Sequence, residues 1–287
     1  MPRGVVPRQP ARTGRQDKVS VARTLMSAKP SQKQSSRAKA EPVKAKAVAP
    51  SKAKKPAKST RGYNRVAPER VTEILKRLNE LYPEVTCALT HNSAWELLVA
   101  TILSAQSTDV NVNRVTPVLF QKYPTVEAFA ALTPEQLEPD VRSTGFFRNK
   151  SRSVVGAAKK LVAEFGGHVP DDMEELLTLP GVARKTANVV LGTWFKKGVG
   201  VVVDTHVHRI SRRLELTKES DPQKIEQDLM KIIPQDRWIL FSHQVIWHGR
   251  KVCFARKPNC VECPLENVCH AGDKTWSTVE MHKNAVG

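Results

Sequence analysis

Four of the chain's five cysteines are concentrated within 17 residues near the C-terminus, and this cluster constrains the fold more than any other feature. Four thiolates on one short segment can hold either zinc or an iron–sulfur cluster, and a bound metal organises the chain around it. Two of the cysteines are paired as in a zinc ribbon, but the wider spacing of the others favours a [4Fe-4S] cluster. A zinc protein with the same ligands is the alternative. The predicted metal ligands are Cys253, Cys260, Cys263 and Cys269.

Positive charge is concentrated at the other end of the chain. Residues 1–62 contain 17 Lys and Arg but only two acidic residues, Asp17 and Glu41, so they carry +15 of the total formal charge of +18. A segment this poor in aliphatic residues cannot bury enough apolar surface to offset the entropy of ordering. We predict a disordered basic arm over residues 1–62 that binds nucleic acid. A solvated linker and an organellar transit peptide are the alternatives.

The cell compartment follows from what the chain lacks. The N-terminal sequence MPRGVVPRQP has no apolar segment of a secretory signal, and no run approaches the roughly 18 apolar residues of a membrane helix. We therefore expect a cytoplasmic, nucleoid-associated monomer without a membrane partner, whose clustered cysteines bind metal and form no disulfides. Cys87 lies alone in the apolar sequence VTCAL and is predicted to be a core thiol.

The remainder of the chain contains the start and stop signals of successive helices. Ser93 and Thr133 each begin a capping-box pattern, and Asp221 precedes a Pro-initiated amphipathic segment. The helix RWILFSHQVIWH (237–248) is expected to end at Gly249. Alternating strand patterns are nearly absent, and VGVVV (199–203) is interpreted as a buried connector. The prediction is an all-α body of roughly ten helices.

A tight turn joins two of these helices. The apolar segment MEELLTL (173–179) meets Pro180-Gly181 and restarts as ARKTANVVLGTW. Such a hairpin leaves unpaired N–H groups at the start of its second helix, where they suit a phosphate oxygen. We predict that Gly181, Val182 and Ala183 contact a nucleic-acid backbone without reading its bases. An ordinary αα-turn is the alternative.

Two segments add charged groups that could carry chemistry. Asp204, in VDTHVHR (203–209), is expected either to cap the following helix or to work with Lys185 as base or electrostatic stabiliser. A lysine amine is a nucleophile only when it is unprotonated, so such a lysine needs a supporting environment. Between the first two clustered cysteines lie Arg256 and Lys257, interpreted either as cations on a loop that metal binding would stiffen or as solvated surface charges.

Taken in order, the hairpin, the VDTHVHR segment and the cysteine cluster resemble the endonuclease III family of the helix-hairpin-helix DNA glycosylase superfamily. The resemblance covers nearly all of residues 63–272. It implies a six-helix barrel domain over 87–197, with the hairpin at about 173–192, and a helical [4Fe-4S] cluster domain built from 63–86 and 198–272. Residues 273–287 would form a C-terminal tail.

The resemblance also implies an activity and its residues. Members are bifunctional DNA glycosylases and abasic-site lyases that act on oxidised pyrimidines or abasic sites in double-stranded DNA. Lys185 matches the catalytic lysine and Asp204 the catalytic aspartate. Gln106, in LSAQSTDVNVN, matches the glutamine that fills the gap left by an extruded nucleotide, and Phe146, in GFFRNKS, falls where the family places an apolar wedge. The four clustered cysteines match the cluster ligands, and Arg256 and Lys257 would face the DNA backbone.

The sequence differs from the family pattern at two points, and two alternative functions are considered. Ala183 stands where a second hairpin glycine is usual, and the spacer between Lys185 and Asp204 is slightly longer than usual. A monofunctional adenine-type glycosylase is disfavoured because Lys185 is present and no carboxylate lies between Glu96 and Asp109. A non-catalytic DNA-binding protein is the other rival, and it predicts DNA binding without strand cleavage.

Overall fold

The computed structural model describes residues 64–275. These residues contain no strand, so the predicted all-α class is confirmed, while the predicted basic arm lies outside them. None of their helices is both long and apolar enough to cross a lipid bilayer. The helices are α1 (Pro68–Leu81), α2 (Ala94–Ser104), α3 (Asp109–Lys122), α4 (Val126–Ala130), α5 (Pro134–Val141), α6 (Phe147–Phe165), α7 (Met173–Leu177), α8 (Arg184–Thr193), α9 (Thr205–Arg213), α10 (Pro222–Ile232) and α11 (Trp238–Lys251), with 3₁₀ turns η1 (Arg142–Thr144), η2 (Gln235–Arg237) and η3 (Glu266–Val268).

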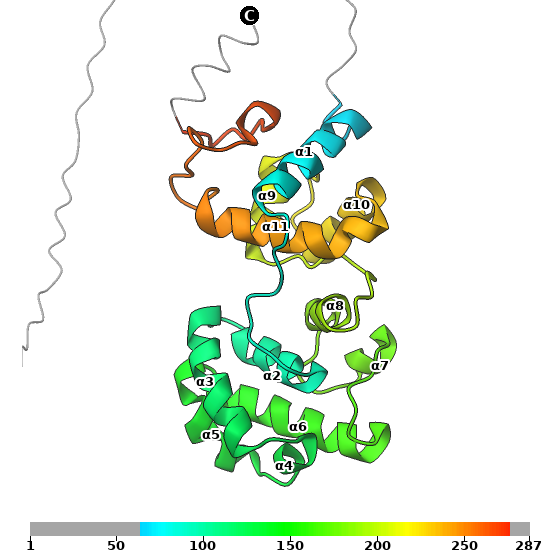
Figure 1. Cartoon of the computed structure of the whole chain (residues 1–287), viewed down its shortest axis with the longest axis vertical. Helices are drawn as coiled ribbons and strands as arrows, with labels where there is room; N and C mark the ends of the chain where they lie inside the picture. The colour runs from blue at the N-terminus through cyan, green and yellow to red at the C-terminus, as the bar shows by residue number, and fades with distance from the viewer. Residues whose placement is uncertain (1–63, 276–287) are drawn as a thin grey trace, which may run out of the picture. The chain divides into compact units, whose positions relative to one another are not determined.

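The helices lie in two groups (Figure 1), and each group surrounds its own hydrophobic core. The first core takes its buried side chains from residues 89–191, and we call the helices around it, α2 to α8, the hairpin lobe. The second takes its buried side chains from residues 71–82 and 201–265, and we call this part, with α1, α9, α10 and α11, the cysteine lobe. Helix α1 packs against α11, so the beginning and end of the described chain meet in the cysteine lobe.

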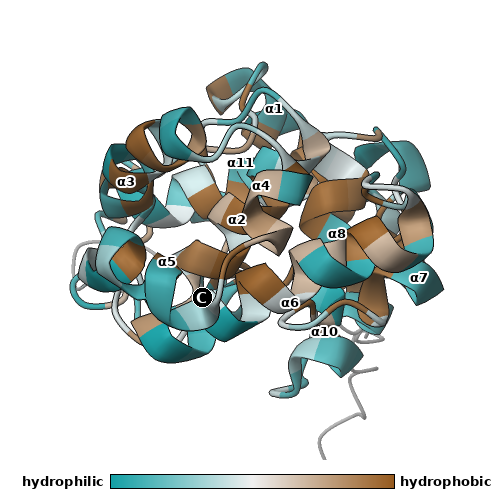
Figure 2. Cartoon of the chain, turned by 90° about the horizontal axis from the view of Figure 1, so that it is seen from below, coloured by the Kyte–Doolittle hydropathy of each residue, from teal (hydrophilic) through white to brown (hydrophobic). Residues whose placement is uncertain are grey.

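Helix α2 is the centre of the hairpin lobe. Its Trp95 and all of its residues 97–103 are buried, and it contacts α3, α6 and α8 (Figure 2). The Ser93 hydroxyl accepts the N–H of Glu96, as predicted, but the Glu96 carboxylate accepts the N–H of Asn92 and not that of Ser93. The capping box at Thr133 is complete, because Gln136 returns the bond to the Thr133 N–H. Both helices therefore begin where their sequences predict.

One predicted helix end is wrong. Helix α11 continues to Lys251, and Gly249 lies inside it instead of capping it. A Cβ atom at Gly249 would stand 2.5 Å from the His206 ring, so this glycine is needed for the close approach of α9 to α11. The predicted connector at 199–203 has no regular structure, and its Val201 and Val202 are buried as expected.

Candidate active site and cysteine cavity

A cleft of about 660 Å³ is lined by residues of both lobes. It brings together four of the predicted site residues, Gln106, Ala183, Lys185 and Asp204, which come from three separate segments of the sequence. The other predicted DNA-contacting residues do not line it: Phe146, Gly181, Val182, Arg256 and Lys257. The volume is that of a pocket for a small organic ligand or a single nucleotide.

Lys185 is the second residue of α8, and this helix begins without a capping side chain. Ala183 occupies the N-cap position, and its methyl group cannot accept the first N–H groups of the helix. The unpaired N–H groups and the positive end of the helix dipole are therefore available to an anion. Lys185 adds its ammonium or amine to the same helix start.

The turn before α8 depends on its glycine. Gly181 has φ of +79°, in the region that favours glycine, and a Cβ there would lie 2.5 Å from the Ser153 side chain. Val182 is buried and its N–H donates to Leu179 O at 3.1 Å. The N–H of Val182 is therefore already hydrogen-bonded within the turn and is not available to a phosphate. The N–H groups that remain as predicted phosphate donors are those of its neighbours in the turn and of the first turn of α8.

Asp204 caps the second helix that begins at the cleft. Its Oδ1 accepts the N–H groups of His206 and Val207, both at 2.8 Å, so the predicted capping role is confirmed. The same carboxylate lines the cleft. Because both cap bonds use Oδ1, the helix fixes the orientation of the carboxylate, and Oδ2 takes no part in the cap. The two interpretations of Asp204 are therefore compatible.

A buried carboxylate of the cysteine lobe holds α8 in place. Glu226, on α10, is only 5% exposed and accepts Arg184 Nε at 2.8 Å and Asn188 Nδ2 at 2.8 Å. The bond to Glu226 raises the pKa of Arg184, which keeps this guanidinium charged. Arg184 and Asn188 flank Lys185 along the helix, so the contact with the other lobe sets the position of the lysine. The sequence analysis did not find this network.

A second ion pair joins the lobes at the edge of the cleft. Arg250, on α11, donates to the carboxylate of Asp109 at 2.5 Å. Asp109 is the first residue of α3 and follows the Gln106 turn closely. The pair therefore ties the Gln106 side of the cleft to the cysteine lobe.

Three predicted DNA-contacting residues have unusual backbone conformations. Gln106, Phe146 and Lys257 have φ of 54°, 48° and 51°, among only five positive-φ non-glycine residues in the described part of the chain. Left-handed φ costs energy for a residue with a Cβ, and such strain is concentrated at functional sites. Gln106 is exposed, and Phe146 is 62% exposed although it is a large apolar side chain. Both side chains are displayed to solvent, as a role in probing DNA requires.

The cleft wall contributes groups that are neutral at neutral pH. Burial lowers the pKa of His243 to about 4, with the charges of Lys196 and Arg250 adding to the effect. Burial also lowers the pKa of His206. Cys87, predicted as a core thiol, packs partly against the first core and also lines the cleft, where burial raises its pKa.

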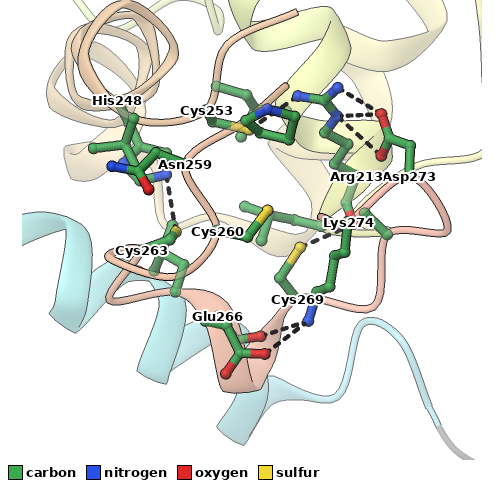
Figure 3. A pocket seen from close by; sticks show the side chains of 16 residues that line it. Arg213, His248, Cys253, Asn259, Cys260, Cys263, Glu266, Cys269, Asp273 and Lys274 are labelled. Carbon is green, nitrogen blue, oxygen red and sulfur yellow. Dashed lines mark hydrogen bonds and ion pairs between the residues drawn. The ribbon is translucent and has the colours of Figure 1, made fainter. Parts of the chain in front are cut away.

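All four clustered cysteines line one cavity of the cysteine lobe, and Figure 3 shows their side chains around a shared space. Arg213 Nη1 donates to Cys253 Sγ at 3.3 Å, and His248 Nε2 lies 3.5 Å from Cys263 Sγ. Burial raises the pKa of Cys263 to about 12, so its thiolate form needs further positive charge close by. Within residues 64–275, no group of three or more His, Cys, Asp or Glu side chains is arranged to hold a metal ion.

Arg213 holds the loop that carries Arg256 and Lys257 through several hydrogen bonds. Besides its bond to Cys253, Arg213 donates to Phe254 O at 2.6 Å and to Ala255 O at 3.1 Å, and pairs with Asp273. Arg256 and Lys257 themselves are exposed. The structure therefore places these two cations on the surface of the cysteine lobe.

Comparison with known proteins gives the class first. Residues 99–235 match the family described as HhH-GPD superfamily base excision DNA repair protein, which spans the hairpin, Lys185 and Asp204. The matched segment, which contains the starts of α8 and α9, is thus that of a helix-hairpin-helix base-excision protein.

Relatives that match a larger share of the chain identify the family within this class. Endonuclease III of Synechocystis sp. is 58% identical over 201 residues, which cover 70% of this chain and 92% of that protein. Endonuclease III of Bacillus subtilis is 43% identical over 202 residues, covering 70% of this chain and 91% of that protein. A solved trapped endonuclease III–DNA covalent intermediate matches with a TM-score of 0.68 and 41% identity, over 71% of this chain and 96% of that one. The chain belongs to the endonuclease III family, as its motifs predicted.

Proposed function

We propose that the cleft carries both activities of a bifunctional DNA glycosylase and abasic-site lyase, with Lys185 as the nucleophile and double-stranded DNA as the partner. The enzyme class follows from membership of the endonuclease III family. The observation that carries the residue assignment is that Lys185 and Asp204 line one cleft, each at the start of a helix. Oxidised pyrimidines are the proposed substrates, because the resemblance implies them.

The first chemical step replaces the base by the lysine. Unprotonated Lys185 Nζ attacks the sugar C1′, and the C1′–N bond to the damaged base breaks with its electron pair leaving on the base. The fixed carboxylate of Asp204 accepts the proton that the amine gives up and stabilises the positive charge that develops on the sugar. Asp204 Oδ2 is suited to this because Oδ1 is already occupied by the helix cap.

The second step breaks the DNA strand. The C1′–O4′ bond then breaks, O4′ takes up a proton, and an iminium (Schiff base) remains between Lys185 and C1′, which acidifies the C2′ proton. Loss of this proton forms the C1′–C2′ enamine, and β-elimination then breaks the bond between C3′ and its phosphate oxygen. Hydrolysis of the remaining Schiff base releases the enzyme. Electrons are only redistributed within the sugar, so no oxidant or reductant takes part.

The DNA must be held and opened before this chemistry. The unpaired N–H groups at the start of α8 are proposed to bind a phosphate next to the lesion, with the turn at Gly181 bringing the backbone close. Phe146 would enter the base stack and Gln106 would occupy the gap left by the extruded nucleotide. A damaged pyrimidine is extruded at lower cost than an intact one, which favours damaged sites.

A [4Fe-4S] cluster is the proposed cofactor, held by Cys253, Cys260, Cys263 and Cys269. Four thiols around one cavity, with the Arg213 guanidinium already donating to Cys253, fit an anionic thiolate-bound cluster. When bound, the cluster would supply a structural link that holds together the loop presenting Arg256 and Lys257. A visible absorption band and iron and sulfide in the purified protein test this proposal against bound zinc.

Incubation with two DNA duplexes tests the function. One duplex contains a single oxidised pyrimidine and the other a single abasic site, each with and without borohydride. We expect base release, cleavage on the 3′ side of the site and a borohydride-trapped covalent adduct. Base release without cleavage or trapping would indicate a monofunctional glycosylase, and DNA binding without either reaction would indicate a non-catalytic DNA-binding protein.

A further inference from the structure

A lysine outside the cleft is buried in the hairpin lobe. Lys150, on α6, is 4% exposed, and its Nζ donates to Leu103 O at 2.8 Å and to Thr144 O at 2.7 Å. No carboxylate of the described residues pairs with it, and burial lowers its pKa. A buried ammonium bonded only to carbonyl groups is a costly way to stabilise a core, since an apolar side chain of similar volume often serves as well.

The two carbonyl groups come from comparable places. Leu103 lies in the last turn of α2, and Thr144 ends the 3₁₀ turn η1. Carbonyls at a helix end have no partner within the helix, and the negative end of the helix dipole favours a cation there. Lys150 therefore joins the ends of two helical segments that are about 40 residues apart in sequence.

Each of these helix ends leads directly into a turn that carries a proposed DNA-probing residue, Gln106 or Phe146. Gln106 follows Leu103 by three residues, and Phe146 follows Thr144 by two. Both probing residues have left-handed φ, at 54° and 48°. A second bond connects the same two turns, because Asn111 Nδ2 donates to Ser143 O at 2.9 Å. The turns are thus joined by one buried and one more exposed contact.

We propose that Lys150 is a positioning residue that holds the Gln106 turn and the Phe146 turn at a fixed separation, so that both enter the DNA as one rigid unit. The proposal rests on the proposed function, in which Phe146 opens the stack and Gln106 fills the gap. Without this link, either side chain could enter the DNA without the other, and extrusion of the nucleotide would lose the benefit of the pair. The chemistry at Lys185 would be unaffected once a sugar is already accessible.

The test compares two substrates that differ in whether a nucleotide must be extruded. For the full chain and its Lys150→Met variant, base excision is measured in single turnover on a duplex with an oxidised pyrimidine, and borohydride trapping on single-stranded DNA with an abasic site. We expect Lys150→Met to lose about 10- to 100-fold in duplex excision, as small misplacements of positioned groups do. Trapping on single-stranded DNA should stay within about twofold of the unaltered protein, because no stacked nucleotide is extruded there.

Two more variants complete the test, one as a matched control and one as an independent break of the link between the turns. Lys160→Met removes another lysine of α6, one that pairs with Glu164 at 3.2 Å, and should change neither reaction. Asn111→Ala removes the more exposed link and should give the same selective loss, of smaller size, even if Lys150→Met fails to fold. Unchanged duplex excision, or equal losses on both substrates, would overturn the positioning role. Absence of trapping by the unaltered protein would instead contradict the proposed function.

Discussion

Helices α8 and α9 both begin at the cleft, and they begin in opposite ways. Helix α8 starts at Ala183 with no side chain on its first N–H groups, whereas α9 starts at Asp204, whose Oδ1 accepts two of them. The uncapped start of α8 leaves its N–H groups available to an external anion, and the capped start of α9 fixes the orientation of the Asp204 carboxylate. One backbone feature, a helix start, therefore supplies both the proposed DNA-binding donors and the proposed catalytic carboxylate.

The two helix starts also belong to different lobes. Helix α8 packs on the first core and α9 on the second, so their placement depends on contacts between the lobes. The bonds from Arg184 and Asn188 to the buried carboxylate of Glu226 provide one such contact, next to Lys185. Consequently the proposed nucleophile and the proposed carboxylate meet only in the folded chain.

The largest expected effect is the loss of DNA cleavage when Lys185, at the uncapped start of α8, is replaced. Lys185→Gln removes the amine but keeps a polar side chain, and duplex cleavage at an abasic site should fall by roughly 10³-fold or more, since no other group can form the Schiff base. Cleavage is measured in single turnover by gel separation of the strands. Lys160→Gln is the matched control on a partly exposed lysine of the same lobe that lies outside the cleft lining. Cleavage by Lys185→Gln at a rate close to that of the unaltered protein would remove Lys185 from the mechanism.

Two substitutions of Asp204 separate its charge from its cap. Asp204→Asn keeps a capping oxygen but removes the charge, so base excision should fall by roughly 10²-fold with little change in unfolding free energy. Asp204→Ala should lose the same activity and in addition about 1 kcal/mol of stability. Excision rates and denaturant unfolding measure the two effects. Full activity of Asp204→Asn would restrict Asp204 to a structural cap.

Breaking the contact between the lobes should lower the stability of the fold. Glu226→Gln removes the buried charge opposite Arg184, and the unfolding free energy should fall by about 1–3 kcal/mol because two donors lose their charged acceptor. Lys224→Gln, on an exposed position of α10, should leave it unchanged. Denaturant unfolding of both variants checks this. A Glu226→Gln variant as stable as Lys224→Gln would show that the pair does not hold α8.

The last expected effect is absent at neutral pH and concerns His243, a neutral side chain of the cleft wall. His243 has a folded pKa of about 4, below its ordinary value of 6.5, so the folded state disfavours its protonated form. Its contribution to stability is complete above pH 6.5 and is lost as the pH falls toward 4, by at most about 1.4 kcal/mol per pH unit. His243→Gln should therefore flatten the dependence of unfolding free energy on pH in this range. Identical slopes for the variant and the unaltered protein would contradict the burial of a neutral ring.

Local signals predicted much of this molecule. Helix starts at Ser93, Thr133, Asp204 and Asp221 follow from short side chains that accept N–H groups a few residues on, and these bonds form in the structure. The motif order was sufficient to identify the family. Lys185 and Asp204 were expected to act together, and both line the cleft.

Residues whose roles depend on distant partners were not predicted. Lys150 and Glu226 lie in helical sequences where a charge normally faces solvent, and only the packing of α6 and α10 shows that both are buried. Gly249 was predicted to end α11 because glycine is common after a helix, but the close approach of His206 is what requires it. Such requirements come from contacts across the fold, which a single sequence does not show.

The central claim is that the Lys185 amine forms the covalent link to DNA. Its most direct test is to trap the unaltered protein on an abasic duplex with borohydride, digest the adduct with protease and nuclease, and find the modified residue by mass spectrometry. The reduced sugar remnant should be on the peptide containing Lys185, on its side-chain nitrogen. A remnant on any other lysine or on the N-terminal amine, with Lys185 unmodified, would contradict the assignment.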